Sequence, residues 1–302
     1  MHAVLFSMLA AVTAAGGAAP PDNPVLAALV RKGVAAPDGS AVKLAAPTMA
    51  DGLDAEAQAE ILTQLAAPHT LPEFLDKSSS APIALKVKTI HRGQATFRTV
   101  DLGFVAHGNW QTLISKKFTE SAFKEKKGQA NGHVVSQLGF LTAEEMEARG
   151  LEPRAKGGQQ ERYFYTTFML FDMVEVSATR YALLGQTRSS IVLAARVDPR
   201  FAGDAQYPNQ WRTVSRDATA KVAYGKPQPY AGAGFYVKVT RLAKPAEAIF
   251  VEYHSAFHEP QGWFDGGNTL RAKLPLIAQH EAKEFRGRLA KASQDDTAPK
   301  EE

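Results

Sequence analysis

The strongest constraint on the fold comes from the spacing of apolar side chains in the last third of the chain. They recur at every second residue in one segment and about every 3.6 residues in the next. In residues 248–258, AIFVEYHSAFH, the apolar side chains fall on one face of an extended strand: Val251, Tyr253 and Phe257. The opposite face carries Glu252, His254 and His258. Residues 270–289 then form one apolar helical stripe: Leu270, Leu274, Ile277, Ala278, Ala282, Phe285 and Leu289. The two patterns predict an α+β fold, in which a curved antiparallel sheet grips a long C-terminal helix and both histidines point away from the core.

Strand-type patterns fill the chain from Ile83 onward. Residues 83–90 and 95–105 alternate between apolar and polar side chains, and 161–185 is dense in aromatic and β-branched residues. Two further strands are expected at 234–242 and 248–258, whereas the Pro-containing stretch 198–211 is expected to be an irregular loop.

A small helical appendage is expected before this sheet. Residues 23–33 suit a short helix with Asn23 as N-cap, and residues 54–68 suit a second helix capped by Asp54. The stretch SSSAP, residues 78–82, interrupts the pattern. We therefore expect an appendage over 20–77, a main domain over 78–290, and a disordered charged tail over 291–302.

The first residues resemble a secretory signal peptide. An apolar run from Ala3 to Ala15 leads into small residues before Pro20, and the run is short for a membrane span. This predicts a signal peptide over residues 1–19, cleaved between Ala14 and Ala19, and export to the periplasm or the cell exterior. A buried N-terminal helix is the alternative.

Composition limits the chemistry and the partners. The absence of cysteine excludes disulfides, thiolate nucleophiles and Cys-ligated zinc. The net charge of +4 is a small surplus, and no RNA-binding motif accompanies it, so no nucleic-acid partner is expected. Basic residues gather in 115–128, interleaved with Glu120 and Glu125. That segment is either a solvated helix face or a site of transient contact with anionic lipid headgroups.

The two histidines of 248–258 are the nearest approach to a catalytic or metal motif. On a strand, His254 and His258 would lie about 13 Å apart, which is too far for one metal ion. The stretch 279–285, QHEAKEF, begins like HExxH but lacks the second histidine. No GxSxG or GxGxxG pattern occurs, so we expect no metal, no cofactor and no enzymatic activity. A catalytic triad dispersed along the chain stays open.

An aromatic-rich sheet under one amphipathic helix can enclose an apolar cavity, which suits a small hydrophobic ligand. The candidate ligand-binding residues are Val237, Tyr253 and Phe257 on the sheet, Trp263 in the stretch after it, and Leu274 and Ile277 on the helix. A filled core is the alternative.

Residues 230–289 resemble the closing part of START-type lipid-transfer domains, members of the helix-grip superfamily. The sequence 259–263, EPQGW, matches that family's turn after its last strand, and Leu274-Pro275 matches a Leu-Pro in its last helix. Phe171 stands before Asp172 where the family has an arginine. The resemblance implies a noncatalytic carrier of a lipid or other hydrophobic molecule, with the last helix as a lid and Trp263 at its hinge.

Three hypotheses follow. The first is an exported protein that binds a lipid or another hydrophobic small molecule. The second is a secreted hydrolase with a loop site near Asp204, His254 and His258. The third is an interaction module whose N-terminal helices, residues 24–66, dock a protein partner that the sequence does not identify.

Overall fold

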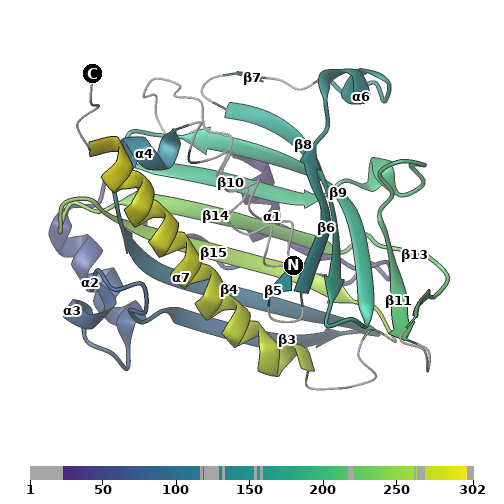
Figure 1. Ribbon diagram of the computed structural model, residues 1–302, viewed down its shortest axis with the longest axis horizontal. Coiled ribbons are helices and arrows are strands. Elements are labelled where there is room, and N and C mark those ends of the chain that lie inside the picture. Colours follow the sequence, from purple (N-terminus) through teal and green to yellow (C-terminus); the bar gives the residue numbers. More distant parts are fainter. Residues whose placement is uncertain are drawn as a thin grey trace.

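The computed structural model describes residues 23–115, 118, 129–130, 133–152, 155–156, 159–216, 221–261, 263 and 269–297. Its main feature is a 13-stranded antiparallel sheet (Figure 1). The strands along its main path are, in spatial order, β3 (Ala84–Arg92), β4 (Ala95–His107), β15 (Ala248–Glu259), β14 (Ala233–Arg241), β10 (Ser190–Val197), β9 (Val174–Gln186), β8 (Gln159–Leu170), β6 (His133–Phe140) and β5 (Gln129–Ala130). Short strands lie off this path: β7 (Ala155–Lys156), β11 (Gln210–Arg216), β12 (Val222–Tyr224) and β13 (Gln228–Pro229).

The strand β9 pairs with β8 along one edge and divides its other edge between β10 and β11. Its C-terminal half pairs with β10, whereas its N-terminal residues 174–177 pair with β11. The strand β11 lies mostly beyond the predicted loop 198–211, and sequence periodicity did not indicate it.

The long helix α7 (Thr269–Thr297) lies across one face of the sheet, which we call the inner face (Figure 1). Alternate residues of β4, including Val100, Leu102 and Phe104, form one buried cluster with the apolar stripe of α7. This arrangement confirms the predicted α+β fold class. The helix continues through Thr297, into the stretch 291–302 for which composition predicts disorder.

Arg286 fixes α7 to the start of the sheet. Its guanidinium donates hydrogen bonds to the backbone carbonyls of Val105, Ala81 and Pro82 at 2.7, 2.6 and 3.0 Å. Burial lowers the pKa of this side chain to about 10. Arg286 does not belong to the apolar stripe predicted from the sequence. In the structure it is nevertheless buried and anchors α7 to the sheet.

The N-terminal segment covers the opposite face of the sheet, which we call the outer face. Helix α1 (Pro24–Arg31), capped by Asn23 as predicted, packs on Tyr236 and Ala256. Helices α2 (Ala55–Ala66) and α3 (Leu71–Phe74) pack over Val105 and Phe250. A two-residue hairpin pair, β1 (Val34–Ala35) and β2 (Ala41–Val42), lies between them in sequence.

The remaining described helices are short: α4 (Trp110–Ile114), α6 (Ala143–Glu147) and the 3-10 helix η2 (Pro199–Phe201). Most of the basic segment 115–128 and the whole predicted signal peptide lie outside the described residues.

Candidate functional site

The inner face brings most of the predicted ligand-binding residues together. Five of them belong to one buried cluster: Val237, Tyr253, Phe257, Trp263 and Leu274. The sixth, Ile277, is also buried but lies outside that cluster. Their location at the interface of sheet and helix agrees with the period analysis, and their contact with a ligand stays a prediction.

The stretch after β15 forms a corner packed on aromatic rings. Trp263 is buried, and its ring stacks on those of Tyr230 and Phe257 at centroid distances of 5.7 and 6.3 Å. Glu259 accepts a 2.5 Å ion pair from Arg98 of β4. The sequence predicts that the glycines at 262, 266 and 267 let the backbone turn after this strand, and these three positions lie outside the described residues.

A buried arginine on the inner face is the feature that sequence reasoning missed. Arg180 of β9 is only 3% exposed, although its neighbours of the same parity, such as Ala178 and Ala182, are apolar core residues. It hydrogen-bonds the hydroxyl of Thr166, and its guanidinium lies 5.8 Å from the ring centroid of Phe164. No carboxylate of the described residues pairs with it. The alternation of 174–184 could have revealed this position, because it puts Arg180 on the apolar face.

Burial disfavours the charged form of this arginine. Desolvation lowers the pKa of Arg180, since the surroundings disfavour the charged form. Burial likewise raises the pKa of the nearby Tyr253 phenol to about 12, so that this neighbour is neutral near pH 7. The inner face therefore holds a cationic group whose partners within the described residues are neutral.

A small cavity of about 20 Å³ lies beside this guanidinium, lined by Arg180, Ala233, Gly234, Phe235, Tyr253, Ser255 and Ala256. The volume suffices for about one water molecule or one ligand oxygen atom. The hydroxyl of Ser255 is buried beside this cavity, next to the phenol of Tyr253. Arg180 and Ser255 thus offer polar groups to the same enclosed space.

The outer face holds a second group of polar side chains, centred on His254. Its Nδ1 lies 2.7 Å from Oδ1 of Asp101, and its Nε2 lies 3.7 Å from Oε2 of Glu252. Burial alone would lower the pKa of His254, but the contacts with Asp101 and Glu252 outweigh it and raise that pKa. The imidazole ring also stacks on Tyr236 at 4.8 Å. His254 is therefore a buried, charge-favoured residue and not a solvent-facing one.

Glu252 ties the N-terminal segment to the sheet. Its carboxylate accepts hydrogen bonds from the backbone N and Oγ1 of Thr48 at 2.7 and 2.5 Å, and from the backbone N of Met49 at 3.1 Å. Burial opposes ionisation, but the hydrogen bonds from His254 and Thr48 outweigh it and lower the pKa of Glu252. The connector 45–51 is thereby held across β15.

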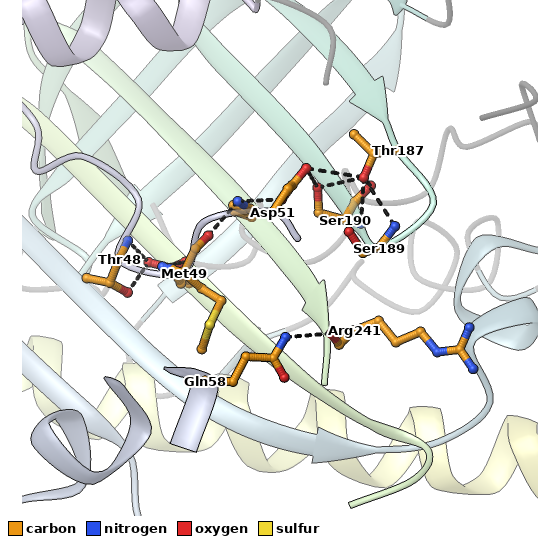
Figure 2. A network of polar contacts seen from close by, with 10 residues as sticks. Thr48, Met49, Asp51, Gln58, Thr187, Ser189, Ser190 and Arg241 are labelled. Carbon is orange, nitrogen blue, oxygen red and sulfur yellow. Dashed lines mark hydrogen bonds and ion pairs between the residues drawn. The ribbon is translucent and has the colours of Figure 1, made fainter. Parts of the chain in front are cut away.

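The same connector continues into a second buried contact on the outer face. Lys238 donates to the carbonyl of Met49 at 2.5 Å and pairs with Asp51 at 2.8 Å. Asp51 also accepts a 2.8 Å hydrogen bond from Ser190 of β10 (Figure 2). Nearer α2, Gln58 donates to the carbonyl of Arg241 at 3.4 Å (Figure 2). Polar contacts as well as apolar packing therefore hold the N-terminal segment on the outer face.

The three residues of the hydrolase hypothesis do not form one group. Asp204 pairs with Arg149 at 2.7 Å, in a cluster with Tyr207. His258 contacts the ring of Phe97, and burial lowers the pKa of His258. Within the described residues, no three His, Asp or Glu side chains are placed to hold a metal ion.

An open cleft of about 500 Å³ lies between the N-terminal segment and the outer face, and we call it the outer cleft. Its lining residues are Ala45, Thr48, Gln64, Leu65, Ala67, Ala84, Leu85, Lys86, Asp101, Leu102, Gly103, Phe250, Glu252 and His254. The sequence did not indicate this cleft, because its walls come from segments more than a hundred residues apart.

Comparison with known proteins assigns this chain to no family. No protein-family model matches this chain, and no curated protein matches it. Among solved structures, the crystal structure of human STARD10 is similar over 84% of this chain and 94% of its own, with 8% identity and a TM-score of 0.32. In the part of the chain that the structure describes, no helix has the length and hydropathy of a membrane span.

Proposed function

We propose that this protein is a noncatalytic carrier of a hydrophobic small molecule with an acidic group, held between the inner face and α7. The observation that carries the proposal is Arg180. A buried guanidinium without a charged partner costs several kcal/mol, and a carboxylate or phosphate would offset much of that cost with bidentate hydrogen bonds. Ser255, beside the same cavity, adds a hydroxyl that can donate to the same acidic group.

The cavity of about 20 Å³ has room only for the acidic end of a ligand, so the apolar body would enter between the clustered side chains of the sheet and α7 only when α7 moves away. Helix α7 would act as the lid, since it closes the inner face and its Leu274 lies in the same cluster as Tyr253 and Phe257. The resemblance of residues 230–289 to START-type domains supports this part of the proposal. We also propose export, from the pattern of residues 1–19, and contact of residues 115–128 with anionic lipid during ligand exchange.

Native mass spectrometry, on protein purified without detergent, tests for the ligand. We expect an adduct of a few hundred daltons that is released on denaturation and ionises as an acid. The same sample then serves in a titration with a dansyl-labelled fatty acid and with its methyl ester. We expect wild type to prefer the acid at least about tenfold, which corresponds to about 1.4 kcal/mol.

The matched variant is Arg180→Met, which keeps the length of the side chain and removes the charge. Replacing a buried charge that has no carboxylate partner among the described residues with an apolar side chain should leave stability unchanged or raise it, so the variant should fold. We expect it to bind acid and ester equally. Equal binding by wild type, or an acid preference that survives in Arg180→Met, would contradict the role of Arg180.

A further inference from the structure

We propose that the outer cleft is a second ligand site, which takes a small organic amine attached to an apolar group. The site is separate from the one proposed on the inner face, since its floor is the opposite side of β4 and β15. Its volume of about 500 Å³ lies within the range of small-molecule sites.

The argument begins with the charges at the floor of the cleft. Asp101 and Glu252 are carboxylates, and His254 between them is favoured in its charged form. With both carboxylates ionised and His254 protonated, these three floor side chains carry a net charge of −1, while the exposed Lys86 at the rim of the cleft carries +1. The floor therefore attracts a cation.

Most of the polar atoms there are already engaged. Both oxygens of Glu252 accept hydrogen bonds from the connector 45–51, and both nitrogens of His254 face a carboxylate. Asp101 differs, since its one partner among the described residues is His254, through Oδ1. Its side chain is 27% exposed, toward the cleft. The oxygen Oδ2 is therefore an acceptor available to a ligand.

Lys86 is the charged group that faces Asp101 from the neighbouring strand. The two residues are register partners on β3 and β4 and both line the cleft. Lys86 is exposed, and no ion pair joins it to Asp101 within the described residues, so water weakens its repulsion of a ligand cation without removing it. Its flexible side chain can turn outward when a ligand amine approaches.

Apolar side chains form the walls above this acceptor. Leu65 and Ala67 of the α2 end face Ala84 of β3 across the cleft, and Ala45 adds to the wall from the connector. An apolar group of the ligand would be partly removed from water there, while its ammonium group meets Asp101. The combination selects an amine with a compact apolar body over a free metal ion or a sugar.

Three probes of similar shape test the charge preference of the full-length protein: phenethylamine, neutral 2-phenylethanol and anionic 3-phenylpropionate. Saturation-transfer NMR and titration calorimetry at low salt should detect phenethylamine binding and at least about tenfold weaker binding of the other two. Equal binding of all three probes, or no binding of phenethylamine, would overturn the proposal.

Two variants locate the site. Asp101→Asn should weaken phenethylamine binding at least about tenfold, whereas Asp172→Asn, at the distant β8–β9 turn, should not change it. Because Asp101→Asn also alters the contact with His254, Lys86→Glu is the second variant. Lys86 is exposed, so the variant should fold, and the added negative charge should tighten amine binding. Unchanged affinity in Lys86→Glu, or in a folded Asp101→Asn, would contradict the site. Arg180→Met should leave amine binding intact, so the two proposals fail separately.

Discussion

His254 is the residue for which the structure most changes the expected effect of a substitution. Its position on the polar face of β15 suggested that His254→Ala would do little, yet the side chain is only 7% exposed and contacts both Asp101 and Glu252. Removing one member of a buried charged group commonly costs about 3 to 5 kcal/mol. We expect His254→Ala to lower the free energy of unfolding by about 3 kcal/mol in urea denaturation. His69→Ala, at an exposed position, is the control and should change it little.

The same residue should give stability a dependence on pH. The pKa of His254 is raised on folding, so its contribution is complete below the unfolded value of 6.5 and is lost as pH rises through the folded pKa. The pKa of Glu252 is lowered, so its contribution is complete above 4.5 and is lost as pH falls through its folded pKa. Both contributions are complete between these two values. Wild type should therefore be less stable at about pH 9 than at about pH 5.5, and His254→Ala should reduce that difference. If the free energy of unfolding changed with pH by the same amount in wild type and His254→Ala, that result would contradict the charged state of His254.

Period-two reasoning predicted the faces of β15 correctly but not their surroundings. It separated Tyr253 from His254 because successive side chains on a strand point to opposite faces. It could not predict that Thr48 and Met49 cover Glu252, because those contacts join residues 204 and 203 positions apart. The same reasoning could have placed Arg180 on the inner face, since the residues around it alternate in the same way.

The elements that sequence predicted best are those with local signals. Asn23 caps α1 and Asp54 caps α2, as their side chains suggested. The strand β11 was missed because residues 210–216 are mostly polar and only Val214 is buried, so they carry no apolar alternation. Local capping and periodicity thus predicted these helices, whereas the pairing of a mostly polar strand left no comparable pattern.

Helix α7 offers a matched pair of substitutions. Leu274 is 2% exposed in the inner-face cluster, whereas Leu276, two residues later, is 56% exposed. Leu274→Asp would bury a carboxylate among apolar side chains and should lower the free energy of unfolding by more than about 3 kcal/mol. Leu276→Asp places the same group in water and should change it by less than about 0.5 kcal/mol. Thermal and urea unfolding of both variants measures this, and similar losses in the two would mean that α7 presents a different stripe to the sheet.

At the scale of the whole molecule, the sheet is buried on both faces, by α7 on the inner face and by the N-terminal segment on the outer face. Leu29 of α1 is 1% exposed and Phe74 of α3 is fully buried, each in a cluster shared with strand residues. The domain boundary predicted near residue 78 is a change in sequence character, and it stays a prediction. In the structure, the segment before that boundary supplies one of the two layers that enclose the sheet.

A deletion distinguishes a structural layer from a separable appendage. Removing residues 23–77 would expose the fully buried Val105 and Phe250, and would leave Glu252 and Lys238 without the connector that pairs with them. Because exposed apolar surface and unpaired buried charge both destabilise a fold, we expect the shortened chain to lose its cooperative thermal transition and to bind the dye ANS. Differential scanning calorimetry and ANS fluorescence measure these two properties. A shortened chain that unfolds cooperatively near the wild-type temperature would instead favour the interaction-module hypothesis, in which residues 24–66 serve a partner and not the sheet.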